Sequence, residues 1–118
     1  MVALNEKELL ILETLVEGNA EKFGFLKSHF ESLYVESRKT TGTSLTITFG
    51  YLKNFDDEEF VNALISAEPK LICPNLKNEL TYCLDITNGK MDFLEVATNG
   101  NEIWDGVLDN CTLVQDKV

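Results

Sequence analysis

The sequence predicts a single α+β domain over residues 1–118, with a sheet of about five strands. Two N-terminal helices precede a β-hairpin, one further helix and an antiparallel β-meander. Three observations predict this fold. Apolar residues recur at helical spacing near the N-terminus, the spacing changes to alternation after Leu33, and Asn-Gly pairs separate the later strand-like segments. Helices that are segregated from strands favour α+β over α/β.

The first two helices are predicted from capping residues and apolar spacing. Asn5 and Glu8 have the spacing of a capping box. A helix over residues 6–17 is predicted from the apolar stripe that follows, which consists of Leu9, Leu12, Leu15 and Val16. Gly18 stands where this helix would end. Asn19 can cap a second helix, in which four apolar residues recur at helical spacing: Phe23, Leu26, Phe30 and Leu33.

A β-hairpin is predicted after the helices. Residues 33–38 and 45–49 alternate apolar and polar side chains, and residues 40–42 form a three-residue loop with a left-handed Gly42. This loop pairs Val35 with Ile47 and Leu33 with Phe49, which places the apolar side chains on one face.

The middle of the chain predicts a helix and a short strand. Four consecutive acids at residues 56–59 favour the positive end of a helix dipole, and the helix is expected to continue through Ala67. Pro69 helps to end it. Residues 70–73 are expected to form a short strand, which Pro74 stops.

The remaining residues predict the meander. Asn88-Gly89 is the strongest two-residue hairpin signal in the chain, between strands at residues 80–87 and 90–97. Asn99-Gly100 predicts a second such turn, leading into a strand at residues 102–107. A final strand is expected near residues 111–115.

The cysteines and the N-terminal residues predict a cytoplasmic protein. Cys73, Cys83 and Cys111 make an odd count with no close pair, so free thiols are expected. The N-terminus lacks the basic start and apolar core of a signal peptide. No apolar run approaches the ~18 residues of a membrane span.

The charge is concentrated in the second half of the chain. Residues 1–55 hold seven acids and six bases, a net charge of −1, whereas residues 56–118 hold thirteen acids and four bases, a net charge of −9. Such asymmetry predicts an acidic face, which repels nucleic acid and anionic membranes and speeds encounter with basic partners. The alternative is that the charge only keeps the protein soluble.

The predicted strand registers bring three candidate site residues together. Two-residue loops at both Asn-Gly pairs would place Glu95 between Tyr82 and Trp104. A carboxylate in that position would be partly desolvated, and its pKa would rise unless neighbouring donors bond to the charged form. Perturbed carboxylates can be general acids or bases. The alternative is a structural carboxylate, since the sequence offers no second catalytic partner.

The other candidates argue against metal and nucleophilic chemistry. Asp85 and Asp92 are predicted to lie opposite each other, where a cation would relieve their repulsion, but two acids without further oxygen ligands make a poor site. His29, the one histidine, is expected to face solvent or a boundary, and Cys83 is expected to be a small core side chain. With no zinc-binding or phosphate-binding motif, the sequence predicts no metal and no cofactor.

Two segments resemble a group of small uncharacterised bacterial single-domain proteins. They are residues 41–49, a Thr-Gly hairpin ending in Phe, and residues 88–95, a Gly-x-x-Asp-x-Leu-Glu strand followed here by Trp104. The chain departs from the group between them, where a charged helix is expected in place of a Pro-rich acidic loop. The resemblance implies bacterial origin and one domain, and it implies no activity.

Two functions are therefore predicted. The first is a non-enzymatic acidic module that binds a basic protein, with a bacterial immunity protein that neutralises a basic toxin as the sharpest version. Its binding residues would be Asp85, Asp92, Glu95, Trp104, Asp105 and Asp109. The alternative is a small-molecule-binding or enzymatic domain that uses a semi-buried Glu95 with Tyr82 and Trp104. A structural subunit that forms a homodimer is a third alternative.

Overall fold

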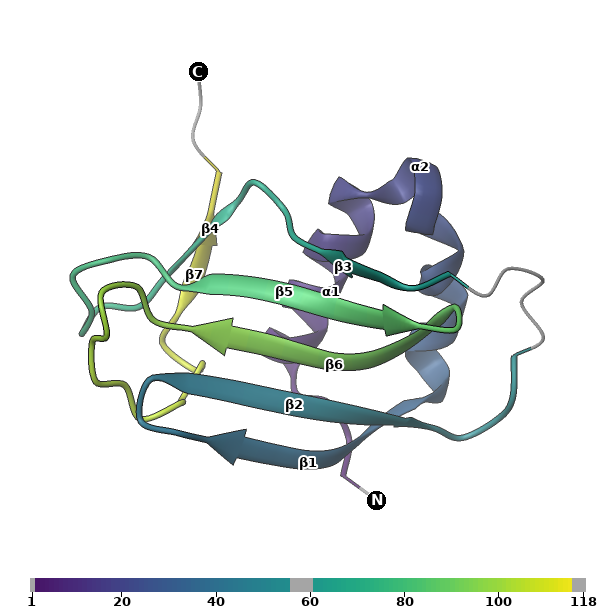
Figure 1. The fold of residues 1–118 in the computed structure, drawn as a ribbon, viewed down its shortest axis with the longest axis horizontal. Helices are drawn as coiled ribbons and strands as arrows, with labels where there is room; N and C mark the ends of the chain where they lie inside the picture. The colour runs from purple at the N-terminus through teal and green to yellow at the C-terminus, as the bar shows by residue number, and fades with distance from the viewer. Residues whose placement is uncertain (1, 56–60, 116–118) are drawn as a thin grey trace.

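The computed structural model describes residues 2–55 and 61–115 and has an α+β fold (Figure 1). A five-stranded antiparallel sheet has the order β1-β2-β6-β5-β3, and β4 and β7 form a separate antiparallel pair. The helical elements are α1 (Glu6–Gly18), α2 (Ala20–Phe23) and the 3₁₀ helix η1 (Gly24–Ser32). The strands are β1 (Leu33–Thr40), β2 (Ser44–Tyr51), β3 (Ala63–Ile65), β4 (Lys70–Ile72), β5 (Thr81–Thr87), β6 (Lys90–Ala97) and β7 (Thr112–Val114).

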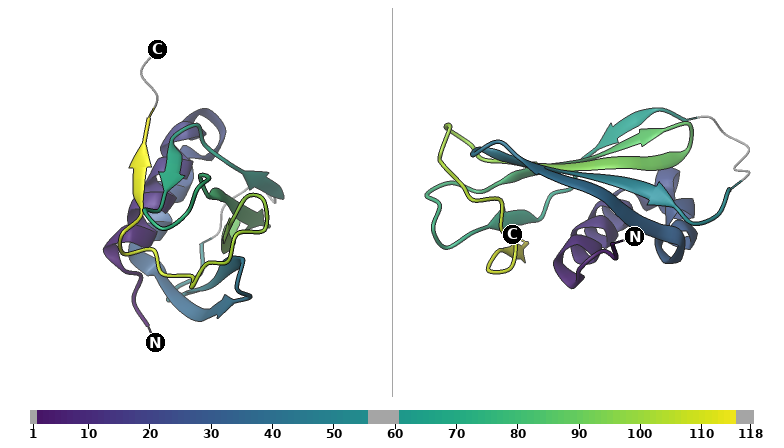
Figure 2. Two further views of the ribbon diagram at one scale, coloured as in Figure 1. Left: turned by 90° about the vertical axis from the view of Figure 1, so that its left-hand side faces the viewer. Right: turned by 90° about the horizontal axis from the view of Figure 1, so that it is seen from below.

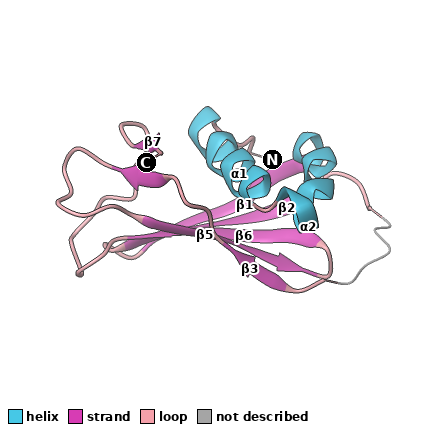
Figure 3. Cartoon of the chain, turned by 90° about the horizontal axis from the view of Figure 1, so that it is seen from above, coloured by secondary structure: helices cyan, strands magenta, loops and turns pink. Residues whose placement is uncertain are grey.

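The helices and the β4–β7 pair cover the same face of the five-stranded sheet. Figure 3 shows α1 and the β4–β7 pair side by side above it, and the right-hand view of Figure 2 shows both on one side of the sheet. The core lies between these two layers. The opposite face of the sheet carries no helix among the described residues, and we call it the outer face.

Helix α1 forms as its sequence predicts. The Asn5 side chain accepts a hydrogen bond from the Glu8 N–H at 2.8 Å, and Glu8 Oε1 accepts one from the Asn5 N–H at 2.9 Å, which completes the capping box. The fully buried stripe consists of Ile11, Leu12, Leu15 and Val16; Ile11 takes the place of the expected Leu9, which is only partly buried. The helix continues one residue beyond the expected end, to Gly18.

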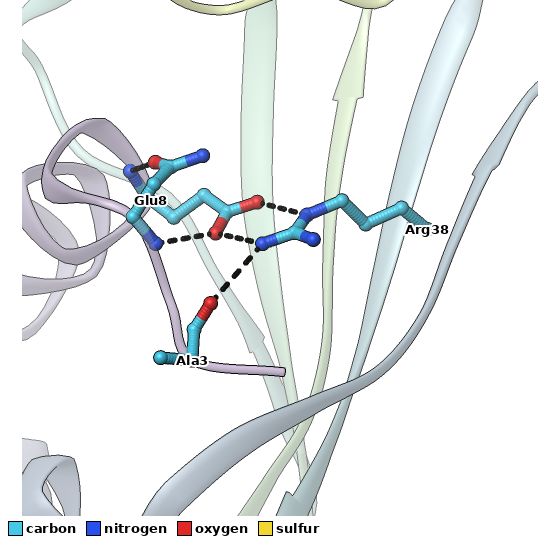
Figure 4. A network of polar contacts seen from close by, with 4 residues as sticks. Ala3, Glu8 and Arg38 are labelled. Atoms are coloured by element: carbon cyan, nitrogen blue, oxygen red, sulfur yellow. Dashed lines mark hydrogen bonds and ion pairs between the residues drawn. The ribbon is translucent and has the colours of Figure 1, made fainter. Parts of the chain in front are cut away.

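Glu8 also ties α1 to the sheet. Its carboxylate is 1% exposed and accepts two hydrogen bonds from Arg38 of β1, at 2.7 Å from Nε and 2.8 Å from Nη2 (Figure 4). These charge-assisted bonds raise the pKa of Arg38. The pair compensates a carboxylate that would otherwise be buried without a countercharge.

The second helix is shorter and more irregular than expected. After α2 the chain tightens into η1, so Leu33 belongs to β1 instead of the helix. Asn19 makes no side-chain cap for α2, because its amide donates to the carbonyls of Leu15 and Ser66. His29 is fully buried against Phe55, at 4.0 Å between ring centroids, so the expectation that it faces solvent or a boundary is wrong.

The first hairpin forms with a shifted register. Gly42 is left-handed as predicted, with φ +91°, but the three-residue loop consists of residues 41–43 instead of 40–42, and Val35 pairs with Phe49 instead of Ile47. A bulge between Val35 and Ser37 shifts the pairing by one further residue toward the turn, where Ile47 pairs with Arg38. Before the bulge the offset is two residues, an even number, so Val35 and Phe49 both stay on the core side.

The third predicted helix is wrong over its described part. Residues 56–60, which hold its acidic start, lie outside the described residues. Residues 63–65 form β3, in which exposed Leu64 and buried Ile65 alternate as in a strand. Strand β3 pairs with the edge of β5, and the hydrogen bonds of that edge favour extended structure over a helix.

The meander ends after one hairpin. Asn88 and Gly89 form the predicted turn with φ values of +53° and +75°. Residues 102–107 form no strand, because β2 already pairs with the edge of β6 that such a strand would need. The predicted strands near residues 70–73 and 111–115 are present as β4 and β7, and they pair with each other.

Cys73 and Cys111 form a disulfide one step beyond the β4–β7 register, with 4.2 Å between their Cα atoms. The expectation of three free thiols is therefore wrong, and Cys83 alone is free. The two cysteines are 38 residues apart, and no sequence pattern indicates that β4 and β7 lie side by side, so this disulfide was not predicted.

Candidate functional site

The candidate site at Glu95 does not form. Glu95 is exposed on the outer face, opposite Cys83 on β5 and Thr46 on β2. Tyr82 lies on the core side, where its hydroxyl donates to the Pro69 carbonyl and burial raises its pKa. The prediction of a semi-buried Glu95 with Tyr82 and Trp104 is therefore wrong.

A β-bulge explains this error. Asp92 is an extra residue on β6, so the pairing shifts by one between Asp85 and Ile86. Since a one-residue shift turns every later side chain to the other face, Glu95 moves outward. Asp85 consequently lies opposite Phe93 instead of Asp92, and its Oδ1 accepts a hydrogen bond from the Thr87 hydroxyl at 2.6 Å.

Cys83 lies on the outer face with Glu95 and is half-buried, so the expectation of a core side chain is wrong. Burial raises the pKa of its thiol, and the negative charges of Glu95 and Asp85 raise it further. A raised pKa lowers the thiolate fraction at neutral pH, which is the opposite of what nucleophilic catalysis requires.

The structure brings the other three predicted residues together in one loop. Trp104, Asp105 and Asp109 all belong to residues 98–111, which we call the C-terminal loop. It runs from the end of β6 past the β1–β2 turn to β7 (Figure 1). The six predicted binding residues are thus divided between the outer face of the sheet and this loop.

Backbone hydrogen bonds fix the course of the C-terminal loop. The Thr98 N–H donates to the Thr43 carbonyl at 2.9 Å, and the Trp104 N–H donates to the Gly42 carbonyl at 2.7 Å. Gly106 has φ +80°, and a Cβ there would lie 2.4 Å from Cγ2 of Thr40, so the loop passes close to β1. The disulfide at Cys111 closes the far end.

Glu102 joins the C-terminal loop to the segment before β5. Its two carboxylate oxygens accept hydrogen bonds from the backbone N–H groups of Lys77 and Asn78, at 2.7 and 3.0 Å. These bonds lower the pKa of Glu102. A second contact between the segments is the Asn99 side-chain amide, which donates to the Glu79 carbonyl at 2.6 Å.

Within this fixed backbone, the C-terminal loop buries one apolar side chain and exposes another. Trp104 is 6% exposed and belongs to the core, whereas the neighbouring Ile103 is 89% exposed. Val107 is also exposed, and it shares a shallow hollow of about 50 Å³ with Pro74 and Asp105. The C-terminal loop therefore exposes apolar side chains on a backbone that hydrogen bonds and a disulfide hold at several points.

The charge of this loop is entirely negative. Residues 98–111 contain Glu102, Asp105 and Asp109 and no base. Asp105 Oδ1 accepts a hydrogen bond from the Val107 N–H at 3.0 Å, which shapes the turn while the side chain stays exposed. No ion pair between residues that the structure describes involves Asp105 or Asp109.

Sequence reasoning named Trp104, Asp105 and Asp109 but missed Ile103. It assigned residues 102–107 to a strand, in which an alternating isoleucine is ordinary. The signal that could have found Ile103 is its position between Glu102 and Trp104, directly after a Gly-Asn turn. This signal can be read only when it is known that β2 occupies the edge of β6, so that residues 102–107 form no strand.

The structure offers neither a metal centre nor a membrane span in the part of the chain that it describes. No group of three or more His, Cys, Asp or Glu side chains is placed to hold a metal ion within residues 2–55 and 61–115. Over the same residues, no helix has the length and apolar character needed to cross a bilayer.

No protein-family model, curated protein or solved structure matches this chain. The resemblance to small bacterial proteins that the two sequence segments suggest therefore stays a prediction.

Proposed function

We propose that the chain is a non-enzymatic protein-binding module that captures a basic protein through its C-terminal loop. The observation that carries the proposal is Ile103, which is 89% exposed on a backbone tied by hydrogen bonds and a disulfide. Single exposed apolar side chains are ordinary on protein surfaces. Here the side chain belongs to a long loop that is anchored at both ends and in its middle.

An anchored loop favours binding because little conformational entropy is lost when a partner covers it. The residues on both sides of Ile103 in the chain are fixed. Trp104 is buried in the core, and the Glu102 carboxylate accepts two backbone hydrogen bonds. A large apolar side chain that fills a partner's pocket is the usual centre of a binding hot spot, worth about 2 kcal/mol or more.

The acids around Ile103 define the partner's charge. Asp105 lies two residues from Ile103, is exposed and forms no ion pair with described residues; Asp109, farther along the same loop, is also exposed, and the chain carries a net charge of −10. Complementary charge speeds association and rejects acidic competitors. A partner with a basic rim around an apolar pocket therefore suits this loop best.

The sharpest version of the proposal is a bacterial immunity protein that neutralises a basic toxin. It is supported by the small size, the acidic charge and the absence of a catalytic constellation at Glu95. In this version, coexpression of the partner with the chain would restore growth that the partner alone prevents.

The test is affinity capture with matched variants. Wild-type protein, Ile103→Asp and Leu64→Asp are immobilised, and a lysate of the source organism is passed over each. Leu64 is a suitable control because it is 64% exposed but lies in β3, away from the C-terminal loop. Circular dichroism first establishes that all three proteins are folded.

We expect a basic protein to be retained by the wild type and by Leu64→Asp, and to be lost with Ile103→Asp. Equal retention by all three proteins, or loss with Leu64→Asp alone, would overturn the proposal. An acidic partner would overturn the charge argument.

A further inference from the structure

Strand β7 buries little of its own surface. It consists of Thr112–Val114, and among the residues that the structure describes it pairs with β4 and with no other strand (Figure 1). None of its side chains is fully buried, and Leu113 is partly buried against the core. An isolated pair of short strands is marginally stable in water. Pairing with β4 alone therefore holds β7 weakly.

Strand β4 is held by bonds that do not involve β7. The Leu80 N–H donates to the Leu71 carbonyl at 2.8 Å, and the Tyr82 hydroxyl donates to the carbonyl of Pro69, the residue directly before β4. Leu71 is also fully buried. Strand β4 can therefore stay on the sheet when β7 leaves it.

The disulfide closes one end of the β4–β7 pairing. Since the Leu71 carbonyl points toward β5, the pairs Lys70–Val114 and Ile72–Thr112 make the hydrogen bonds between β4 and β7. Cys73 and Cys111 follow as the next pair along the two strands. A covalent bond at this position keeps β7 at the edge of β4 and so raises its effective concentration there.

The two sulfur atoms differ in their access to solvent. Cys73 is 5% exposed and lines the hollow of about 50 Å³ that it shares with Asp105 and Val107, whereas Cys111 is fully buried. A thiol in solution therefore reaches Sγ of Cys73 first. Sγ of Cys111 lies 3.7 Å from the Val107 carbonyl oxygen, which can accept a hydrogen bond from a free thiol. That bond would hold a reduced Cys111 to its own loop and not to β4.

We propose that the Cys73–Cys111 disulfide is a redox-sensitive switch, whose reduction releases β7 from β4 while the five-stranded sheet and the helices stay folded. The thiolate of a small thiol of the glutathione class attacks Sγ of Cys73, and the Cys111 sulfur leaves and takes a proton from solvent. A second small thiol attacks the mixed disulfide, and the Cys73 sulfur is protonated in turn. The two small thiols become one disulfide, and the protein gains the two electrons and two protons that they lose.

The small burial of β7 makes this reduction a local event. Segments with few buried apolar contacts open without unfolding the rest of a domain. Release of β7 opens the edge of β4 at Lys70 and Ile72, and the bond between Leu71 and Leu80 is kept. The residues on both sides of Ile103 also keep their own contacts, so the switch stands or fails separately from the proposed function.

The test compares oxidised and reduced protein in a Cys83→Ser background, in which every thiol that a labelling reagent detects comes from the switch. The ¹⁵N-labelled protein is equilibrated with a mixture of reduced and oxidised glutathione at a cytosolic ratio. We expect both Cys73 and Cys111 to become labelled, and the Thr112 and Val114 amides to exchange at least about tenfold faster.

The Leu80 amide is the internal control, since its hydrogen bond to Leu71 does not involve β7. Its exchange rate should stay unchanged, and re-oxidation should restore the protection of β7. The double variant Cys73→Ser, Cys111→Ser should show the fast exchange with and without glutathione.

Three results would overturn the proposal. If the folded protein acquires no thiols in the glutathione mixture, the bond is a permanent structural cross-link. If Thr112 and Val114 keep their protection after reduction, pairing alone holds β7. If Leu80 loses its protection to the same extent, the disulfide holds the whole fold and is no local switch.

Discussion

The two ends of the sheet are covered on the same face by different means. At the end near the β5–β6 turn, α1, α2 and η1 pack a continuous apolar stripe onto the strands. At the end near the β1–β2 turn, β4, β7 and the C-terminal loop form the cover, with Trp104, Leu108 and the Cys73–Cys111 disulfide beneath. We call these the helical end and the loop end.

The two ends of one core are stabilised in different ways. The helical end is held by side-chain packing and by the ion pair of the buried Glu8 with Arg38. The loop end is held by a disulfide and by hydrogen bonds between side chains and backbone. At this end apolar side chains such as Ile103 and Val107 are exposed to solvent. Recognition is therefore expected at the loop end.

The largest effect should come from the disulfide. Replacing Cys73 and Cys111 with Ser should lower the free energy of unfolding by about 2–4 kcal/mol, because the unfolded chain regains the entropy of a closed loop. Urea unfolding with and without reductant measures it, and Cys83→Ser is the control. Equal stability of oxidised and reduced wild type would show that the loop end does not depend on the bond.

At the helical end, Glu8→Ala should cost about 2–3 kcal/mol, because it removes half of the capping box and leaves Arg38 without its carboxylate. Glu13→Ala on the exposed side of the same helix is the control and should change stability by less than about 0.5 kcal/mol. If the two variants unfold at the same urea concentration, the ion pair does not hold this end.

The outer face gives a smaller and more local effect. Glu95→Gln should increase the rate of alkylation of Cys83 by iodoacetamide at pH 8 by up to about threefold, since a neighbouring negative charge no longer raises the thiol pKa. Asp92→Asn should leave the rate unchanged. A slower reaction of Glu95→Gln would contradict the register around the β6 bulge.

The smallest effect concerns the pH dependence of the loop end. The pKa of Glu102 is lowered in the folded protein, so its contribution is present at neutral pH and is lost as the pH falls below about 4.3 and through the depressed pKa. We expect faster hydrogen exchange of the Lys77 and Asn78 amides in that window. Glu102→Gln should remove the pH dependence, and its persistence in this variant would assign it to another group.

Sequence reasoning succeeded where a periodic pattern decides the structure. The α1 stripe, the β1–β2 alternation and the Asn88-Gly89 turn follow from the residues themselves. Sequence reasoning failed where the secondary structure of a segment depends on pairing with a strand that is distant in the chain. The β3 strand exists because an edge of β5 was free, and residues 102–107 stay irregular because the edge of β6 was taken.

The candidate site was predictable only in part, for the same reason. Asp105 and Asp109 were chosen from charge alone; both are exposed, and Asp105 shares a hollow with the exposed Val107. Glu95 was placed from a turn-defined register, which the single extra residue Asp92 reversed. Neither that bulge nor the disulfide leaves a periodic signal in the sequence.

If the loop end is the recognition surface, the affinity for the partner depends on Ile103 and not on Leu64. The dissociation constant of the captured partner is determined by calorimetry for the wild type, Ile103→Asp and Leu64→Asp. The account predicts that Ile103→Asp weakens binding at least about 30-fold and that Leu64→Asp stays within about threefold of the wild type. A weaker complex with Leu64→Asp and an unchanged one with Ile103→Asp would contradict it.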